Sequence, residues 1–99
     1  MAYNRTNLVT GQATLSTTSA IFVQSNLERD FIRVSNTEVP AVDPADDVLI
    51  AVGPSPASMT TAIIIRPGMS EDFPCNNALA AIASEGTPVL QYAEYTTSD

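Results

Sequence analysis

Carboxylates are the only chemically active side chains that this sequence offers in number. Its 99 residues include eleven acidic residues, four arginines and one cysteine, with no lysine and no histidine. Without histidine there is no ordinary general base near neutral pH, no partner for a serine or cysteine nucleophile, and no imidazole ligand for zinc or copper. Without lysine there is no amine for a Schiff base or a phosphate loop. We therefore expect a protein that is not an enzyme and that uses no cofactor and no metal.

The acidic residues form two groups that could begin a cation site. Asp43, Asp46 and Asp47 lie in a proline-containing segment, and a Glu-Asp pair occupies positions 71 and 72. Oxygen ligands suit calcium, but the D-x-D-x-D-G pattern of a calcium loop is absent. The favoured interpretation is an exposed, stiff acidic loop at 37–47, and a weak calcium site at 43–47 is the alternative.

Charge and hydropathy exclude several kinds of partner. A net charge of -7 and a pI near 4.1 argue against nucleic acid and against an anionic membrane surface, since both need a basic footprint. The mean hydropathy of +0.08 is high for this charge, which indicates apolar surface that a partner covers. The chain starts without an apolar signal segment and has no run that could span a bilayer, so we expect synthesis in the cytoplasm.

The sequence has few cationic side chains and a single thiol, and each has an expected role. Arg29, Arg33 and Arg66 fall at the edges of predicted strands, where pairing with nearby carboxylates of the same chain is favoured and contact with a second subunit is the alternative. Cys75 cannot form a disulfide within the chain, and we interpret it as a small buried apolar residue.

Short apolar segments separated by turn residues must position these side chains. The segments are 20–23, 31–34, 48–52, 62–65, 78–83 and 89–95, and the seven prolines lie at or just outside their ends. Proline cannot donate to a strand ladder, so this placement is typical of strands. The pattern predicts one all-β domain at 15–99, a small antiparallel β-sandwich or jelly-roll-like barrel of seven or eight short strands. Residues 1–14 are expected to be an N-terminal arm or an irregular first strand.

Two details of this prediction concern the core and two possible helices. Alternation places Ile32 and Val34 on the core face of their strand. The runs 48–52 and 63–65 are apolar on both faces, so each needs cover from a second sheet and a loop or from another subunit. Helix and strand both remain open at 25–34 and at 77–85, because each segment carries helix-capping residues and helix-forming residues.

The order of these segments resembles the small β-sandwich proteins that decorate, or cement, the capsids of tailed bacteriophages. The resemblance spans Ser19 to Glu94 and includes the segment 26–36 with its closing Asn, the Pro-Gly turn within 65–73, and the last two segments at 78–87 and 89–94. It implies that 78–83 is a strand. It also implies a homotrimer that binds the outer surface of the assembled head and bridges subunits of the major capsid protein.

The resemblance places the expected contacts on particular residues. The expected partners are the major capsid protein and other copies of the chain, with no nucleic acid and no membrane, and the expected location is the virion surface. Candidates for capsid contact are Tyr3, Asn4, Arg5, Leu8 and Val9. Candidates for the subunit interface are Arg29, Arg33, Arg66, Ile64 and Tyr92. The alternative function is a receptor- or glycan-binding module at a phage tail, fibre tip or head fibre, with Tyr92, Tyr95 and the acidic loop facing the ligand.

Overall fold

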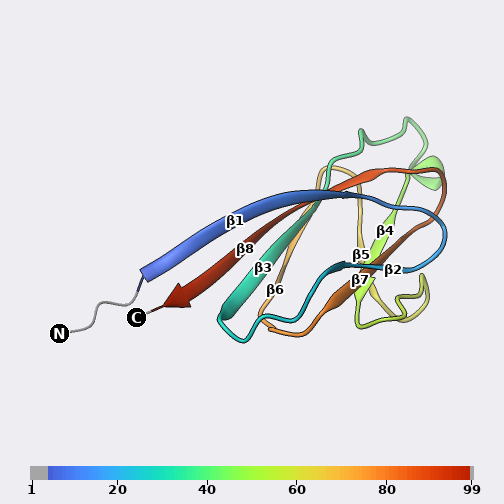
Figure 1. The fold of residues 1–99 in the computed structure, drawn as a ribbon. Coiled ribbons are helices and arrows are strands. Elements are labelled where there is room, and N and C mark those ends of the chain that lie inside the picture. Colours follow the sequence, from blue (N-terminus) through green and yellow to red (C-terminus); the bar gives the residue numbers. More distant parts are fainter. Residues whose placement is uncertain (1–4, 99) are drawn as a thin grey trace.

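The chain folds into two facing four-stranded antiparallel sheets, as a computed structural model shows for residues 5–98 (Figure 1). The strands are β1 (Arg5–Thr14), β2 (Ala20–Val23), β3 (Arg29–Asn36), β4 (Ile50–Gly53), β5 (Ile63–Ile65), β6 (Ser70–Phe73), β7 (Leu79–Ala83) and β8 (Val89–Ser98). Sheet A has the strand order β1-β8-β3-β6, and sheet B has the order β2-β7-β4-β5. The predicted β-sandwich is confirmed. No helix within the described residues is long and apolar enough to cross a membrane.

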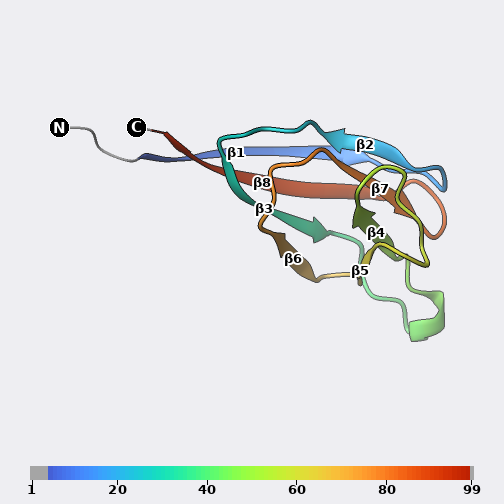
Figure 2. The same ribbon diagram turned by 90° about the horizontal axis from the view of Figure 1, so that it is seen from below.

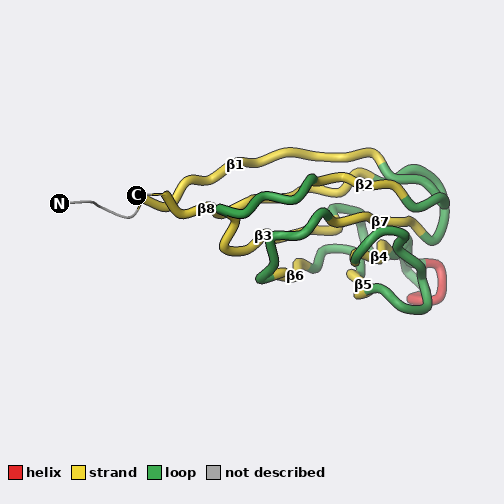
Figure 3. The backbone as a smooth tube through the Cα atoms, turned by 60° about the horizontal axis from the view of Figure 1, so that its bottom comes forward, coloured by secondary structure: helices red, strands yellow, loops and turns green. Residues whose placement is uncertain are grey.

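The pairing of the strands defines a jelly roll. β1 pairs with β8, β2 with β7, β3 with β6 and β4 with β5, so the chain is one long hairpin folded over on itself. The pairs β3–β8 and β4–β7 join the folded halves into the two sheets. This connectivity is that of the eight-stranded jelly roll. Figure 3 shows the strands as two layers, with a short 3-10 turn at Pro44–Asp46 beyond them.

Both segments with helical propensity are strands in the structure. Before β3, the side chain of Asn26 accepts a hydrogen bond from the Glu28 N–H at 3.0 Å, which closes a tight turn and not a helix. β7 lies between β2 and β4 and is buried almost throughout. Pairing on both sides and burial outweigh the modest propensity of alanine-rich sequence for helix.

The core lies between the sheets and is covered from within the chain. Ile32 and Val34 are completely buried on the predicted face of β3. β4 is buried on both faces: Val52 faces the core, whereas Ala51 lies outside the core cluster and is nevertheless inaccessible. The loop at 54–62 supplies the second cover. Its buried Ala57 donates a backbone hydrogen bond to Ser19 Oγ at 2.8 Å.

Asn36 ties the two sheets together at the end of β3. Its side chain is 1% exposed, and its Nδ2 donates to the carbonyl oxygens of Val48 and Ile65 at 3.0 Å each. Its Oδ1 accepts from the Glu38 N–H at 3.0 Å. All of the usual partners of a buried amide are therefore supplied by segments that lead into or out of sheet B.

The first strand extends past the body of the sandwich. Residues 5–14, for which the sequence left arm or strand open, form a regular strand that pairs with β8 along its whole length. Figure 1 shows β1 and β8 reaching well beyond sheet B toward the chain ends. The molecule is accordingly elongated, with extents of 55 × 25 × 19 Å.

Candidate interaction surfaces

Arg29, a candidate for the subunit interface, is turned into its own chain. Its side chain is fully buried, and its guanidinium donates to the backbone carbonyls of Gln24, Asn77 and Cys75 at 2.5, 2.8 and 3.4 Å. Its Nε has no hydrogen-bond partner but lies 3.6 Å from Glu94 Oε2, an ion-pair distance. The cation thus holds the loop after β2 and the loop before β7 against sheet A, and the carboxylate that it pairs with is Glu94 on β8.

Arg33 forms the second ion pair across neighbouring strands. Its Nε and Nη2 donate to the two carboxylate oxygens of Asp72 at 2.7 and 3.1 Å, with both side chains about half exposed. The hydrogen bonds from Arg33 hold the pKa of Asp72 below its ordinary value, and those same bonds raise the pKa of Arg33. The predicted pairing within the chain is correct for this arginine, and the partner is Asp72.

The two C-terminal tyrosines have different surroundings. Tyr92 packs against the core beside Phe22, with ring centroids 5.7 Å apart. Its ring lies over Gly11, where a Cβ atom would approach the Tyr92 hydroxyl to 2.5 Å. Tyr95 stacks on Phe31 with centroids 4.2 Å apart, and both side chains are partly exposed. Tyr92 is itself partly exposed, so both tyrosines present some aromatic surface.

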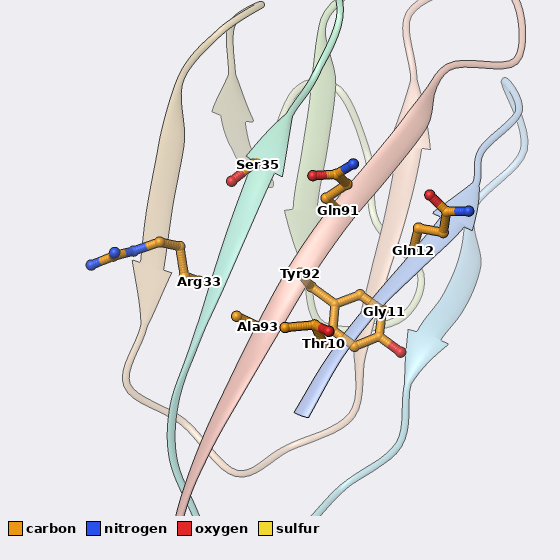
Figure 4. Close-up of a pocket in the computed structure, with 8 residues that line it drawn as sticks. All are labelled: Thr10, Gly11, Gln12, Arg33, Ser35, Gln91, Tyr92 and Ala93. Atoms are coloured by element: carbon orange, nitrogen blue, oxygen red, sulfur yellow. The ribbon is translucent and has the colours of Figure 1, made fainter. Parts of the chain in front are cut away.

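The outer face of sheet A carries an open polar hollow of about 440 Å³ (Figure 4). Its lining consists of Thr10, Gly11, Gln12, Arg33, Ser35, Gln91, Tyr92 and Ala93. The register places Gln12, Gln91 and Ser35 in one row across three strands, with small Ala93 in the next row. The amide and hydroxyl groups of this lining could hydrogen-bond to a polar ligand.

The acidic loop uses its carboxylates for its own conformation. Asp43 accepts from the Ala45 N–H at 3.0 Å, and Asp47 accepts from the Ala41 N–H at 2.8 Å. Among the described residues no three acidic or cysteine side chains are grouped as metal ligands. Val42, immediately before Asp43, is fully exposed.

A more apolar groove lies beside the edge strand β5. It has a volume of about 440 Å³ and is lined by Leu49, Met59, Ile64, Ile65, Arg66, Met69 and Glu71. Ile64 and Arg66, both candidates for the subunit interface, thus lie together. The two ion pairs found among the described residues belong to Arg29 and Arg33, so Arg66 is the cation that the fold leaves at the surface.

The predicted capsid-contact residues fall on β1 or before it. Tyr3 and Asn4 lie outside the described residues, and Arg5 begins β1. Leu8 and Val9 are 57% and 54% exposed, and they point to opposite faces of the strand. Leu8 and Val9 lie on an edge strand of sheet A, which no local pattern of the sequence indicates.

Comparison with known proteins bears on the fold. No protein-family model matches the sequence, and no curated protein matches it. A solved structure described as a Bacillus endospore appendage, from a family of disulfide-linked pili, is similar with a TM-score of 0.54. The alignment covers 96% of this chain and 89% of that chain at 16% identity. At 16% identity, this similarity shows a shared fold and nothing more. The description names a bacterial spore appendage and not a phage protein.

Proposed function

We propose that this protein is a non-catalytic structural subunit that acts by packing against other protein chains. The observation that carries the proposal is the distribution of its large apolar side chains. Eight of them are exposed among the described residues, on sheet edges and protruding loops. They are Leu8, Val9, Ile21, Leu27, Val39, Val42, Ile63 and Met69. A domain this small gains stability by covering such surface with a partner.

The polar side chains support the same proposal. Arg29, Asp43 and Asp47 hold the fold, and Arg33 is paired with Asp72. A catalytic site would need titratable groups that converge on a cavity with displaced pKa values. The lowered pKa of the Asp72 carboxylate is due to Arg33, a partner on the adjacent strand at the surface.

The specific structural role that we propose is capsid decoration. A homotrimer of this sandwich would sit on the outside of a tailed-phage head and bridge subunits of the major capsid protein. The net charge of -7 favours this outside position, because it keeps the protein soluble and repels the packaged nucleic acid. Many copies on one shell also gain avidity from individually weak contacts.

The contact residues of this assembly are part of the proposal. Tyr3, Asn4 and Arg5, at the start of the sequence, are assigned to the shell. Of the other candidates, Leu8, Val9, Ile64 and Arg66 are those that the fold leaves open to another chain. Arg29 and Tyr92 stabilise the subunit itself.

The number of copies per particle tests the decoration role. Quantitative mass spectrometry of purified virions should find hundreds of copies, bound to the head and released without opening it. A handful of copies would transfer the protein to a tail or fibre tip. Its absence from virions would overturn the proposal.

Receptor or glycan binding is the second candidate, and the polar hollow on sheet A is the observation that favours it. Gln12, Gln91 and Ser35 offer amides and a hydroxyl, and Tyr95 lies on the same face two rows further along β8. A glycan array probed with the purified protein would reveal this activity. Binding abolished by Gln91→Ala and retained by Val42→Ala would locate it in the hollow.

The similar structure is described as a disulfide-linked pilus. We do not propose such disulfide linkage for this chain. Linking each copy to two neighbours by disulfides requires two cysteines per copy, and these 99 residues hold only Cys75. The proposed assembly therefore relies on non-covalent contacts.

A further inference from the structure

One side of the sandwich is free of charge. Residues 6–27 contain no charged side chain, although the whole chain carries eleven acidic residues and four arginines. This span includes both β1 and β2. β1 is an edge of sheet A and β2 is an edge of sheet B, and Figure 2 shows both strands along the same side of the sandwich. We call this surface, formed by the outward edges of β1 and β2, the uncharged side.

The two sides of the sandwich differ in how their edges are protected. Natural sheets shield edge strands with charge, proline or short length, because an open edge pairs readily with another strand. On the opposite side β5 has three residues and is followed by Arg66, while β6 has four residues and carries Glu71 and Asp72. β1 has ten residues without proline, and no charge follows Arg5. The long edge therefore lacks every one of these protections.

Apolar side chains flank this open edge on both faces. Leu8 and Val9 are more than half exposed on opposite faces of β1, and Ile21 on β2 is 46% exposed. A strand that lies against β1 would add main-chain hydrogen bonds along this edge and cover apolar side chains on either face of the sheet. The surface thus suits binding of another polypeptide better than binding of a small ligand.

We propose that the occupant is a second copy of this chain, docked along the uncharged side. Two copies with a net charge of -7 repel each other over most of their surfaces, and the uncharged side is where they approach without placing like charges in contact. In the proposed trimer, the β1 edge of one copy meets the β2 edge of the next. Such a head-to-tail contact forms a closed ring when the rotation between copies closes.

This inference rests on the proposed function, since it names the surface through which the copies of the assembly meet. It assigns Leu8 and Val9 to contact between copies. Contact with the shell then remains with Tyr3, Asn4 and Arg5.

Sedimentation equilibrium of the purified chain tests the inference. The wild-type protein should self-associate, and Leu8→Glu or Ile21→Glu should raise the dissociation constant by about tenfold or more, because each places a like charge in the contact. Val42→Glu is the matched control, because it adds the same charge to a fully exposed valine on the acidic loop. It should leave association nearly unchanged. All three variants should unfold at wild-type temperatures, because the replaced side chains are exposed.

Each opposite result overturns the inference. A wild-type chain that stays monomeric up to about 1 mM would show that copies do not meet through this surface. An equal loss of association in Val42→Glu would show general charge repulsion. Virions that carry hundreds of copies while the free chain is monomeric would refute this inference alone. Self-association through β1 by a protein absent from virions would refute the decoration role alone.

Discussion

At the scale of single residues, Arg29 is the polar side chain on which the fold depends most. Its buried guanidinium joins the loops around 24 and 75–77 to sheet A through three carbonyls, and Glu94 balances its charge. Removal of one partner from a buried ion pair leaves an uncompensated charge in a poorly solvated site.

Arg29→Met should therefore lower the free energy of unfolding by about 3–5 kcal/mol. Urea denaturation followed by circular dichroism measures this loss. The control is Arg33→Met, which removes an arginine whose side chain is half exposed and which should cost far less. Equal losses in the two variants would contradict a special role for the buried cation.

The pair of Arg33 and Asp72 yields a prediction about pH. Because the folded pKa of Asp72 is lowered, its contribution to stability is complete above the ordinary aspartate pKa of about 3.9 and is lost as pH falls through the folded value. In an NMR titration, the Asp72 carboxyl should titrate below that ordinary value, and Arg33→Gln should move its pKa upward. An unchanged midpoint in Arg33→Gln would show that the hydrogen bonds of Arg33 are not the cause.

At the scale of elements, the contact between β1 and β8 depends on a glycine. Gly11 is paired with Tyr92, and a Cβ atom at position 11 would lie 2.5 to 3.0 Å from the hydroxyl and ring atoms of Tyr92. The ring is held by the core and by Phe22, so it has little freedom to move away.

Gly11→Ala should destabilise the protein by about 1–3 kcal/mol through overpacking. Tyr92→Leu in the same chain should cost less than the sum of the two single changes, because the smaller side chain removes the clash. Thermal unfolding of the single and double variants completes this cycle. Gly53→Ala is the control, since its new Cβ would meet only the Ala62 methyl group, at 3.3 Å. Strict additivity would contradict the proposed clash.

At the scale of the whole molecule, net charge and the uncharged side act in opposite directions. Repulsion between copies acts at a distance and is screened by salt, whereas a contact free of charged side chains loses nothing to screening. Self-association should therefore strengthen between about 50 mM and about 500 mM sodium chloride. Light scattering at fixed protein concentration provides the measurement. Weaker association at high salt would indicate a contact built on opposite charges, such as Arg66 against the acidic loop.

The sequence predicted the local features of this molecule better than the contacts between distant residues. Alternation at 31–34 and proline punctuation predicted the strands of a β-sandwich and the buried face of β3, because both signals act within a few neighbouring residues. Composition alone was also informative. Without histidine and lysine, the side chains of this chain lack the usual general base and the usual amine nucleophile.

Only the tertiary structure decided which distant residues meet. Arg29 pairs with Glu94 and not with its sequence neighbours, and Tyr92 turns inward because Gly11 on the paired strand leaves room for its ring. The helix-prone segment at 77–85 contains the strand β7, because β7 pairs with β2 on one side and with β4 on the other. Strand pairing and burial join positions far apart in the chain, and these contacts outweigh local propensity. They also make β1 an edge, which turns an uncharged stretch of sequence into an uncharged side of the molecule.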